Sequence, residues 1–464
     1  MRGYLRLFVV LVAAAACAPS GGDGGGGGTG PTGPNGPPPP TEPIFYVDAN
    51  AGLDTNDGRT AIKAFKTLNR AASSVKPGWT VRVMSGTYTS DGSSNPMTLS
   101  ISGTADAPIK FVAADGQHPV VRIPRGPGGW AGIQLLGVSY VVIDGFEVVG
   151  LNQSITAAEA SANNGTQAPL NHNGIFIDGV GFADVHPPVP HDIVIRNSVV
   201  HDCAGAGIEV NVGDAITIEH NRVYNNAWWT VFGTSGIGMY HLTDAPGSTV
   251  KNGYKNFVVG NLSYGNRNNL PFLAGSPPAV YDGNGIIIDD SMHTQPALGT
   301  NDKLNVAYAG RTYIANNIVH DNGGRGVHVY RSEHIDIVNN TAWNDLLSTS
   351  GYLDSGEIDA YSSRDVNVIN NVAQNLVGKD VTLTDGNHYN YDYNLWDGVS
   401  APYHGTNDLL VPAQLTDPGN GNFAPRAGSP ALGSATGVLA PADDFFGVAR
   451  RAGAVDRGAV QVSK

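Results

Sequence analysis

The sequence predicts an all-β chain folded as a right-handed parallel β-helix, a solenoid with a helical cap at its N-terminal end and an irregular closing tail at its C-terminal end. Three observations predict this fold. A short strand pattern recurs six times, an asparagine follows each copy, and both ends of the chain depart from the repeat. Recurrence of this kind indicates a stack of coils in which each coil contacts only its neighbours.

The recurring pattern is a short strand in which apolar residues alternate with other types. A period of two predicts that the second and fourth residues face the core and that the third and fifth face outward. The six copies align without internal gaps. They are GIFIDG at Gly174, GIEVNV at Gly207, GIGMYH at Gly236, GIIIDD at Gly285, GVHVYR at Gly326 and EIDAYS at Glu357.

Two further apolar runs follow each copy and meet at one asparagine. The distance from the start of the copy to this asparagine is fourteen residues in the coils of Asn221, Asn340 and Asn371. Three strands per turn, stacked about 4.8 Å apart, form a parallel β-helix. We predict that the asparagines bend the chain and bond to the next coil. Their positions are Asn197, Asn221, Asn261, Asn317, Asn340 and Asn371.

Atypical segments are expected at both ends because a solenoid must cover its open core and its edge strands. The apolar residues between Phe65 and Val75 fall near helical spacing and predict a short amphipathic helix over the N-terminal opening. The irregular runs from Asn422 and Pro441 predict the closing tail. The expected organisation is a cap with first coils at 44–131, repeats at 132–400 and the tail at 401–464.

Residues 1–17 predict an export signal. Arg2 and Arg6 precede an apolar run too short to cross a bilayer, and small residues lead into Cys17. Lipidation of Cys17 would give an outer-membrane or cell-surface lipoprotein that meets the membrane only through its lipid anchor. The alternative is an ordinary signal and a secreted protein. Residues 18–43 are rich in Gly and Pro and predict a linker that cannot bury a core.

Composition narrows the classes of function. The net charge is -13, the pI is about 5.3 and no basic cluster occurs, which argues against a nucleic-acid partner because such a partner needs a positive surface. With Cys17 lipidated, Cys203 has no partner for a disulfide, so packing and backbone hydrogen bonds must hold the fold. We expect a monomer.

The stretch FYVDANAGLDTNDGRTAIKAFKTLNRAA, followed by KPGWTVRVMSGTY, is similar to the opening module of polysaccharide lyase family 9. Together with the coils it resembles the secreted right-handed β-helix proteins of the pectate lyase superfamily, over nearly everything after the linker. The resemblance implies a substrate cleft on the sheet of the recurring strands. The superfamily contains lyases, hydrolases, epimerases and non-catalytic adhesins, so the resemblance is specific for fold rather than for activity.

The outward positions of the recurring strands carry polar, aromatic and ionisable side chains. Long insertions adjoin these strands and predict walls along a groove that suits a long polymer. We therefore expect an extracellular acidic polysaccharide as the partner. The residues expected to bind it are Glu209, Asn211, Tyr240, His241, Arg325 and Tyr361.

His328 and Asp359 share one outward column on adjacent coils and form a candidate reaction centre. Uronate β-elimination needs a base for the C5 proton, a positive group or metal at the carboxylate, and an acid for the leaving oxygen. His328 or Tyr330 is the expected base, and Arg331 or Arg325 the neutralising group. The alternative is a structural pair in which His328 only hydrogen-bonds Asp359. A polysaccharide lyase is the function that we rank first.

Asp282, Asp289 and Asp290 supply the hard oxygen ligands that calcium takes, which predicts a calcium site. Turn formation is the alternative role of these residues. The resemblance to family 9 lyases implies a lysine base and a calcium-binding aspartate cluster. At the position of that lysine this chain has Ile287 or His328.

Two other functions stay open. In polygalacturonase-type hydrolysis, paired aspartates on one coil and a histidine on the next carry the reaction, an order that Asp289, Asp290 and His328 repeat. Asp289 is therefore a catalytic candidate as well as a metal ligand. The third function is a surface-tethered glycan-binding scaffold without turnover, which the outward tyrosines suit because aromatic faces bind sugars without catalysis.

Overall fold

The computed structural model describes residues 43–181, 188–295, 306–348, 350, 353, 356–383, 385 and 389–462. The chain divides into two units, 1–41 and 42–464, and every described helix and strand belongs to the second. The predicted export signal, Cys17 and nearly all of the linker lie outside the described residues. In the described part of the chain no helix combines the length and hydropathy that crossing a membrane requires.

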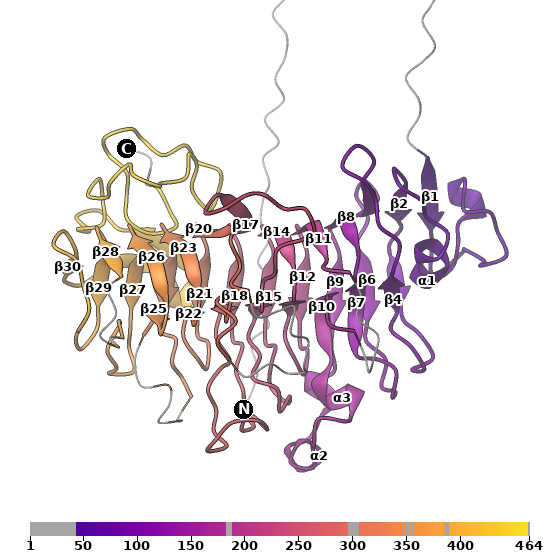
Figure 1. Cartoon of the computed structure of the whole chain (residues 1–464), viewed down its shortest axis with the longest axis horizontal. Helices are drawn as coiled ribbons and strands as arrows, with labels where there is room; N and C mark the ends of the chain where they lie inside the picture. Colours follow the sequence, from indigo (N-terminus) through magenta and orange to yellow (C-terminus); the bar gives the residue numbers. More distant parts are fainter. Residues whose placement is uncertain are drawn as a thin grey trace, which may run out of the picture. The chain divides into compact units, whose positions relative to one another are not determined.

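Three long sheets make up the second unit (Figure 1). From β4 to β27 the chain visits them in a constant order, so each turn adds one strand to the eight-stranded sheet, one to the first eleven-stranded sheet and one to the second. Neighbouring strands within these sheets run parallel. The fold is the right-handed parallel β-helix that the sequence predicts.

The elements have the following bounds. The eight-stranded sheet contains β4 (Met97–Leu99), β7 (Ala131–Leu136), β10 (Asn173–Asp178), β13 (Ile208–Asn211), β16 (Ile237–Tyr240), β19 (Ile286–Asp289), β22 (Val327–Tyr330) and β25 (Ile358–Tyr361). The first eleven-stranded sheet contains β1 (Ile44–Val47), β2 (Thr80–Val83), β5 (Ile109–Ala113), β8 (Ser139–Asp144), β11 (His191–Arg196), β14 (Asp214–Glu219), β17 (Tyr254–Val259), β20 (Arg311–Ala315), β23 (Glu333–Val338), β26 (Arg364–Ile369) and β28 (Asn390–Asp392). The second contains β3 (Gly86–Tyr88), β6 (Pro119–Arg122), β9 (Glu147–Val149), β12 (Val199–His201), β15 (Arg222–Tyr224), β18 (Leu262–Tyr264), β21 (Ile318–His320), β24 (Thr341–Trp343), β27 (Val372–Gln374), β29 (Leu395–Asp397) and β30 (Leu409–Leu410). Outside these sheets lie β31 (Leu415–Asp417), β32 (Asn422–Pro425), α1 (Leu68–Ala72), α2 (Ala157–Ala160), α3 (Ala168–Asn171) and the 3-10 turns Ala61–Lys63, Asn152–Ser154 and Pro418–Asn420.

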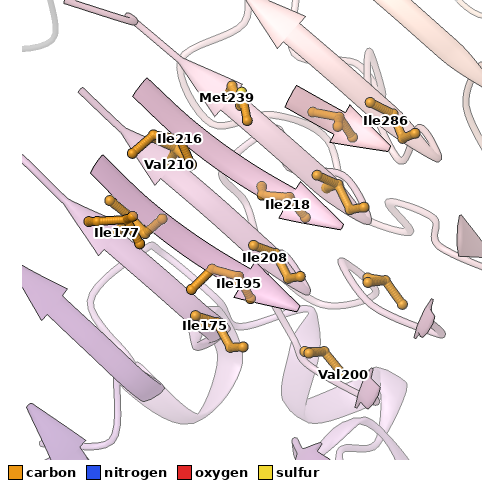
Figure 2. Packing of buried hydrophobic residues seen from close by; sticks show 14 of the residues in the cluster. Ile175, Ile177, Ile195, Val200, Ile208, Val210, Ile216, Ile218, Met239 and Ile286 are labelled. Carbon is orange, nitrogen blue, oxygen red and sulfur yellow. The ribbon is translucent and has the colours of Figure 1, made fainter. Parts of the chain in front are cut away.

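Columns of aliphatic side chains, one from each coil, fill the core. Ile175 pairs in register with Ile208, which pairs with Ile237, and all three are fully buried. Figure 2 shows Ile195 and Ile218 in the same cluster, contributed by the first eleven-stranded sheet. Burying each such side chain stabilises the fold by about 1.5–3 kcal/mol. Branched residues suit these columns because they pack well on a pleated surface.

The predicted N-terminal helix is confirmed as α1. It begins after Thr67, whose side chain accepts a hydrogen bond from the backbone N–H of Arg70, the usual role of an N-cap threonine. Phe65, Leu68 and Val75 are buried and belong to the main core cluster. The helix therefore extends the apolar core at its N-terminal end.

A ladder of asparagines forms the corner between the two eleven-stranded sheets. The backbone N–H and Nδ2 of Asn261 both donate to Oδ1 of Asn317, at 2.9 and 3.0 Å. Nδ2 of Asn261 also donates to the carbonyl of Ile218 in the preceding coil, at 2.8 Å. Each rung thereby joins three coils and satisfies a buried amide. The ladder runs through Asn221, Asn261, Asn317, Asn340, Asn371 and Asn394 and ends on Asp408.

Asn197 is not part of this ladder, so its predicted place was wrong. Ser198 takes the position instead, and its backbone N–H donates to Oδ1 of Asn221 at 3.0 Å. Asn197 lies one residue earlier, in the left-handed conformation at φ 51°, and donates to Asp144. Asparagine is favoured in both places, because it forms ladders and also tolerates a positive φ. The sequence pattern therefore could not tell the two positions apart.

A second, shorter ladder, which the sequence pattern did not predict, follows the second eleven-stranded sheet. Asn226 donates to Asn266, and Asn266 to Asn322, with the same pair of bonds. Cys203 begins this ladder, since its backbone N–H donates to Oδ1 of Asn226 at 3.0 Å. Its thiol is buried and free. Asp345 ends the ladder and accepts both bonds of Asn322 at 2.8 Å.

Two buried carboxyl groups meet at the end of the second ladder. The backbone N–H of Asp345 donates to Oε2 of Glu357 at 3.3 Å, and both side chains are fully buried. Burial raises the pKa of Glu357 to about 7, and burial together with the negative charge of Glu357 raises the pKa of Asp345 well above its usual range.

The C-terminal tail lies along the corner formed by the first ladder (Figure 1). Three asparagines that directly precede ladder asparagines hold it there, and all three have a positive φ. The predicted irregular tail therefore covers the flank of the last coils. The bonds run from Asn316 to the carbonyl of Asp443 at 2.6 Å, from Asn339 to that of Asp456 at 3.0 Å and from Asn370 to that of Thr436 at 2.8 Å.

Asn317→Ala is expected to lower the free energy of unfolding by about 2–4 kcal/mol. It removes the two side-chain N–H donors of Asn317 and leaves the backbone N–H and one Nδ2 hydrogen of Asn261 without an acceptor. The measurement is the shift of the urea unfolding midpoint, followed by circular dichroism. Asn269→Ala is the matched control; this exposed residue is outside the ladder and its φ is not positive, so we expect its loss to cost less than about 1 kcal/mol. Equal effects of the two changes would contradict the role of the ladder.

Candidate functional site

The outer face of the eight-stranded sheet carries the predicted columns in the predicted register. Each coil contributes its third and fifth strand residues, and strand pairing places these residues side by side. The third-position column is Phe176, Glu209, Gly238, Ile287, His328 and Asp359. The fifth-position column is Asp178, Asn211, Tyr240, Asp289, Tyr330 and Tyr361.

Long connections lie at both ends of the strands in this sheet. Those that enter it include 150–172, which carries α2 and α3, and 265–285 (Figure 1). Those that leave it include 241–253. The ladder corner, by contrast, is tight: only Gly260 and Asn261 separate β17 from β18. The long connections therefore lie beside the two outward columns, as the sequence predicts.

His328, Asp359 and Arg325 come together on the last coils of this sheet. Nδ1 of His328 lies 2.6 Å from Oδ1 of Asp359, which is fully buried. Nε of Arg325 lies 3.1 Å from Oδ2 of the same carboxylate. Because a carboxylate only accepts, Nδ1 of His328 is the donor, and in the neutral imidazole the lone pair therefore lies on Nε2. The predicted pair thus orients the imidazole as a base in catalysis requires.

Glu209 and Asp282 form a second group on this face. Burial, followed by the negative charge of Asp282, raises the pKa of Glu209 to about 8. Its Oε2 atom is buried and has no hydrogen-bond partner among the described residues. Oδ1 of Asp282 accepts a hydrogen bond from Nδ2 of Asn284 at 3.1 Å. Burial raises the pKa of Asp282, while the positive charges of His328 and Arg325 oppose this rise.

Asp289, in the fifth-position column, lies near the carboxyl groups of Glu209 and Asp282. Its Oδ1 accepts a hydrogen bond from Nε2 of Gln295 at 2.6 Å. Burial raises the pKa of Asp289 well above its usual range, and the charges of Asp282, Asp290 and Glu209 raise it further. Three carboxyl groups therefore share one partly dehydrated region, and each disfavours ionisation of the others.

His241, Asp290 and Arg331 do not extend the columns, because each directly follows its strand. All three have a positive φ, between 46° and 52°, so the chain turns at these residues. Nε2 of His241 lies 2.7 Å from Oδ2 of Asp290, and both side chains are buried. His241 thus ties the end of its strand to Asp290, and its role in substrate binding stays a prediction. Arg331 instead folds onto its neighbour Tyr330, with Nε 3.0 Å from the hydroxyl oxygen.

Of the three predicted calcium ligands, Asp282 and Asp289 lie near each other, whereas hydrogen bonds to other partners hold Asp290. Oδ1 of Asp290 accepts hydrogen bonds from the Thr294 backbone and hydroxyl, at 2.7 and 3.1 Å, on the His241 side of the turn. Although burial raises the pKa of Asp290, its hydrogen bonds to His241, Thr294 and Gln295 lower it more. Among the described residues no group of three His, Cys, Asp or Glu side chains is placed to hold a metal ion. Calcium binding stays a prediction from the sequence.

The predicted tyrosines line the fifth-position column. The rings of Tyr330 and Tyr361 stack with centroids 6.1 Å apart, and the ring of His328 lies 5.9 Å from that of Tyr330. Tyr361 is exposed, whereas Tyr240 and Asn211 are half-buried. Burial raises the pKa of Tyr240 above its usual range. These residues remain candidates for contact with a sugar ring.

An apolar surface that the sequence pattern did not predict lies beside these carboxyl groups, next to Asp282. Phe232 is 41% exposed and Leu273 56% exposed. A Cβ atom on Gly165 would lie 3.1 Å from Phe232 and 3.5 Å from Leu273, so the two side chains flank one glycine. The aromatic run that ends at Phe232, WWTVF, was the available signal in the sequence. Exposed aromatic side chains beside a polar site are typical of sugar-binding surfaces.

A cavity of about 280 Å³ lies elsewhere, at the corner of the first ladder. Asn197, His220, Arg222 and Phe445 are among its lining residues. It contains none of the carboxyl groups of the eight-stranded sheet. The chemistry of the chain therefore points to the sheet face rather than to this cavity.

The fold and its outer face define the protein as a parallel β-helix with an ionisable sheet surface. No family model matches the sequence, and no curated protein matches it. Among solved structures, pectate lyase Pel9A is similar, with a TM-score of 0.53 and 16% identity over 90% of this chain and 96% of that one. A rhamnogalacturonan lyase gives 0.48 and 15% over 88% and 99%. A lacto-N-biosidase from Eubacterium ramulus gives 0.41 and 15% over 79% and 57%. The likeness to Pel9A establishes the fold.

Glu209→Gln is expected to stabilise the protein at alkaline pH. The folded pKa of about 8 lies above the ordinary value of 4.5, so the unfolded state loses this proton first as the pH rises. The native carboxyl group therefore lowers the free energy of unfolding as the pH rises between these two pKa values, and the full loss is reached above the higher one. At pH 9 the gain should be about 5 kcal/mol, and at pH 4 close to zero.

The melting temperatures of the two proteins at these two pH values test this expectation. Glu219→Gln, on the first eleven-stranded sheet, is the matched control for losing a carboxylate. A difference that does not change with pH would contradict the assignment of a raised pKa to Glu209.

Proposed function

We propose that the protein hydrolyses glycosidic bonds of an extracellular polysaccharide on the outer face of the eight-stranded sheet. The observation that carries the proposal is the carboxyl pair Glu209 and Asp282. Burial and the charge of Asp282 raise the pKa of Glu209 to about 8, whereas His328 and Arg325 oppose the rise that burial causes in the pKa of Asp282. Two carboxyl groups whose surroundings separate their pKa values are suited to act as acid and base.

In this proposal Glu209 is the general acid. It protonates the glycosidic oxygen while the bond from that oxygen to the anomeric carbon breaks. Asp282 takes a proton from the water whose oxygen attacks the anomeric carbon. If the two carboxyl groups are close, Asp282 instead attacks that carbon to form a glycosyl ester, which a water deprotonated by Glu209 then hydrolyses. A positive charge on His328 stabilises the ionised form of Asp282, and the hydrogen bond to the buried Asp359 keeps the His328 ring oriented.

β-Elimination is the second candidate, and the His328–Asp359 pair favours it. In that reaction Nε2 of His328 would take the C5 proton of a uronate, and Tyr330 would lie beside it. Both predicted neutralising groups already have partners, however. Arg325 is ion-paired with Asp359, and Arg331 bonds to Tyr330 and to the carbonyl of Thr294. A uronate carboxylate would have to compete with these contacts and with three carboxyl groups, which ranks elimination second.

The sequence supports the extracellular setting. The export signal, the lipidation of Cys17 and the Gly- and Pro-rich linker stay proposals, as do the monomeric state and the closer relation to polysaccharide lyase family 9. Pectate lyase Pel9A has a similar fold, and this likeness supports the proposal of a polysaccharide partner. A tether of this kind would hold the outer sheet face within reach of polymers at the cell surface.

The purified full-length protein is expected to release reducing ends from at least one member of a panel of neutral and uronate polysaccharides, without the ultraviolet absorbance of an unsaturated product. Glu209→Gln should lower kcat by about 10²–10⁴ because the general acid is lost. His328→Ala should lower it by only about tenfold because it weakens a supporting charge. Each assay is run with added calcium and with EDTA, which also tests the predicted metal.

Two results would overturn this assignment. An unsaturated product whose release disappears in His328→Ala would establish a lyase. Tight binding of a polysaccharide without either product would identify a scaffold.

A further inference from the structure

Gly238 lies beside Glu209 in the third-position column, directly below its carboxyl group. A Cβ atom on Gly238 would lie 2.4 Å from Oε2 of Glu209, 3.0 Å from its Cδ and 3.1 Å from Oε1. Carbon and oxygen atoms that are not bonded do not approach this closely. The carboxyl group therefore occupies the volume that any other side chain at position 238 would need.

The backbone does not require glycine at this position. Gly238 lies inside β16 and pairs with Glu209 on one side and Ile287 on the other, and its φ is not positive. Glycine in the middle of a strand costs roughly 0.5–1 kcal/mol relative to alanine. What the position provides is space, since the other five residues of this column all carry side chains.

Asp282 lies against a glycine in the same way. A Cβ atom on Gly233 would lie 2.4 Å from Oδ2 of Asp282, and Gly233 also lacks a positive φ. Gly233 follows the exposed Phe232 in the connection between β15 and β16. Both members of the proposed acid–base pair thus rest on positions without a side chain.

We propose that Gly238 and Gly233 are positioning residues, whose missing side chains form the two sockets that hold the carboxyl groups of Glu209 and Asp282 together. This inference rests on the proposed function for its catalytic consequence, and on the contacts alone for its structural one. A methyl group at position 238 would meet the end of a flexible side chain rather than backbone. The expected response is therefore a displaced Glu209 in an intact fold.

Gly238→Ala is expected to lower kcat by at least about tenfold, since displacement of a catalytic group by 1 Å can cost as much as a hundredfold. KM should change less than kcat, because the position of the acid matters most in the transition state. The alkaline limb of the pH profile should move to lower pH, because a displaced carboxyl group is better hydrated. Gly437→Ala is the matched control; a Cβ atom on this glycine would meet no other atom within 4 Å, and no change is expected.

The double variant Glu209→Asp/Gly238→Ala separates the socket from other roles of Gly238. Aspartate is one methylene shorter and does not reach across Gly238. Adding the alanine to Glu209→Asp should therefore change kcat less than about twofold. The same loss in both backgrounds would overturn the proposal and assign the space above Gly238 to the substrate. A Gly238→Ala variant with the wild-type rate and pH profile would overturn it as well.

A titration of Glu209 by carbon-13 NMR tests the socket without any substrate. In Gly238→Ala the pKa of Glu209 should fall from its native value toward the ordinary one, while the melting temperature shows that the protein is folded. An unchanged titration would overturn the inference even if the protein is a hydrolase. A shifted titration in a protein that cleaves no polysaccharide would uphold the sockets and reject the proposed function.

Discussion

Everything on the outside of this solenoid depends on the hydrogen bonds that fix the register of one coil on the next. The asparagine ladder achieves this because each buried amide donates to the next coil and to the preceding one, as Asn261 does with Asn317 and Ile218. A slip by one residue would leave these donors unpaired in an apolar interior and would turn every core side chain outward. The register of Glu209, Gly238, Ile287 and His328 on the outer face follows from that internal constraint.

The same constraint explains where the chain can vary. The corner of the ladder is occupied by short turns and is further covered by the tail, which the asparagines before the rungs hold in place. Insertions at that corner would break the ladder. The long connections lie instead at the two ends of the strands in the eight-stranded sheet. Scaffold and candidate site are thereby separated onto different faces, and loops can change beside the site while the coils stay stacked.

The carboxyl groups of the site are held in a state that works against stability. Glu209 is buried with one oxygen unpaired, and its raised pKa means that ionisation is disfavoured in the native protein. Such a group is hard to explain as structural support, because a buried polar atom without a partner lowers stability. Oδ2 of Asp359 also has no hydrogen bond among the described residues, but His328 and Arg325 compensate the charge of this carboxylate. The contrast between a compensated and an uncompensated carboxyl group is what distinguishes a possible acid from a structural anchor.

The sequence by itself determined the coil, the core columns, the outward columns and five of the six predicted asparagines, because alternation and stacking are properties of nearest neighbours along the chain and between coils. It also brought His328 to Asp359. The tertiary structure decided what lies between coils or beyond the strands. A positive φ marks the residues at which the chain turns and alternation no longer applies, which include Asn197, His241, Asp290 and Arg331. The acid character of Glu209 was equally inaccessible from the sequence, since it depends on burial, on Asp282 from a distant loop and on the absence of a side chain at Gly238.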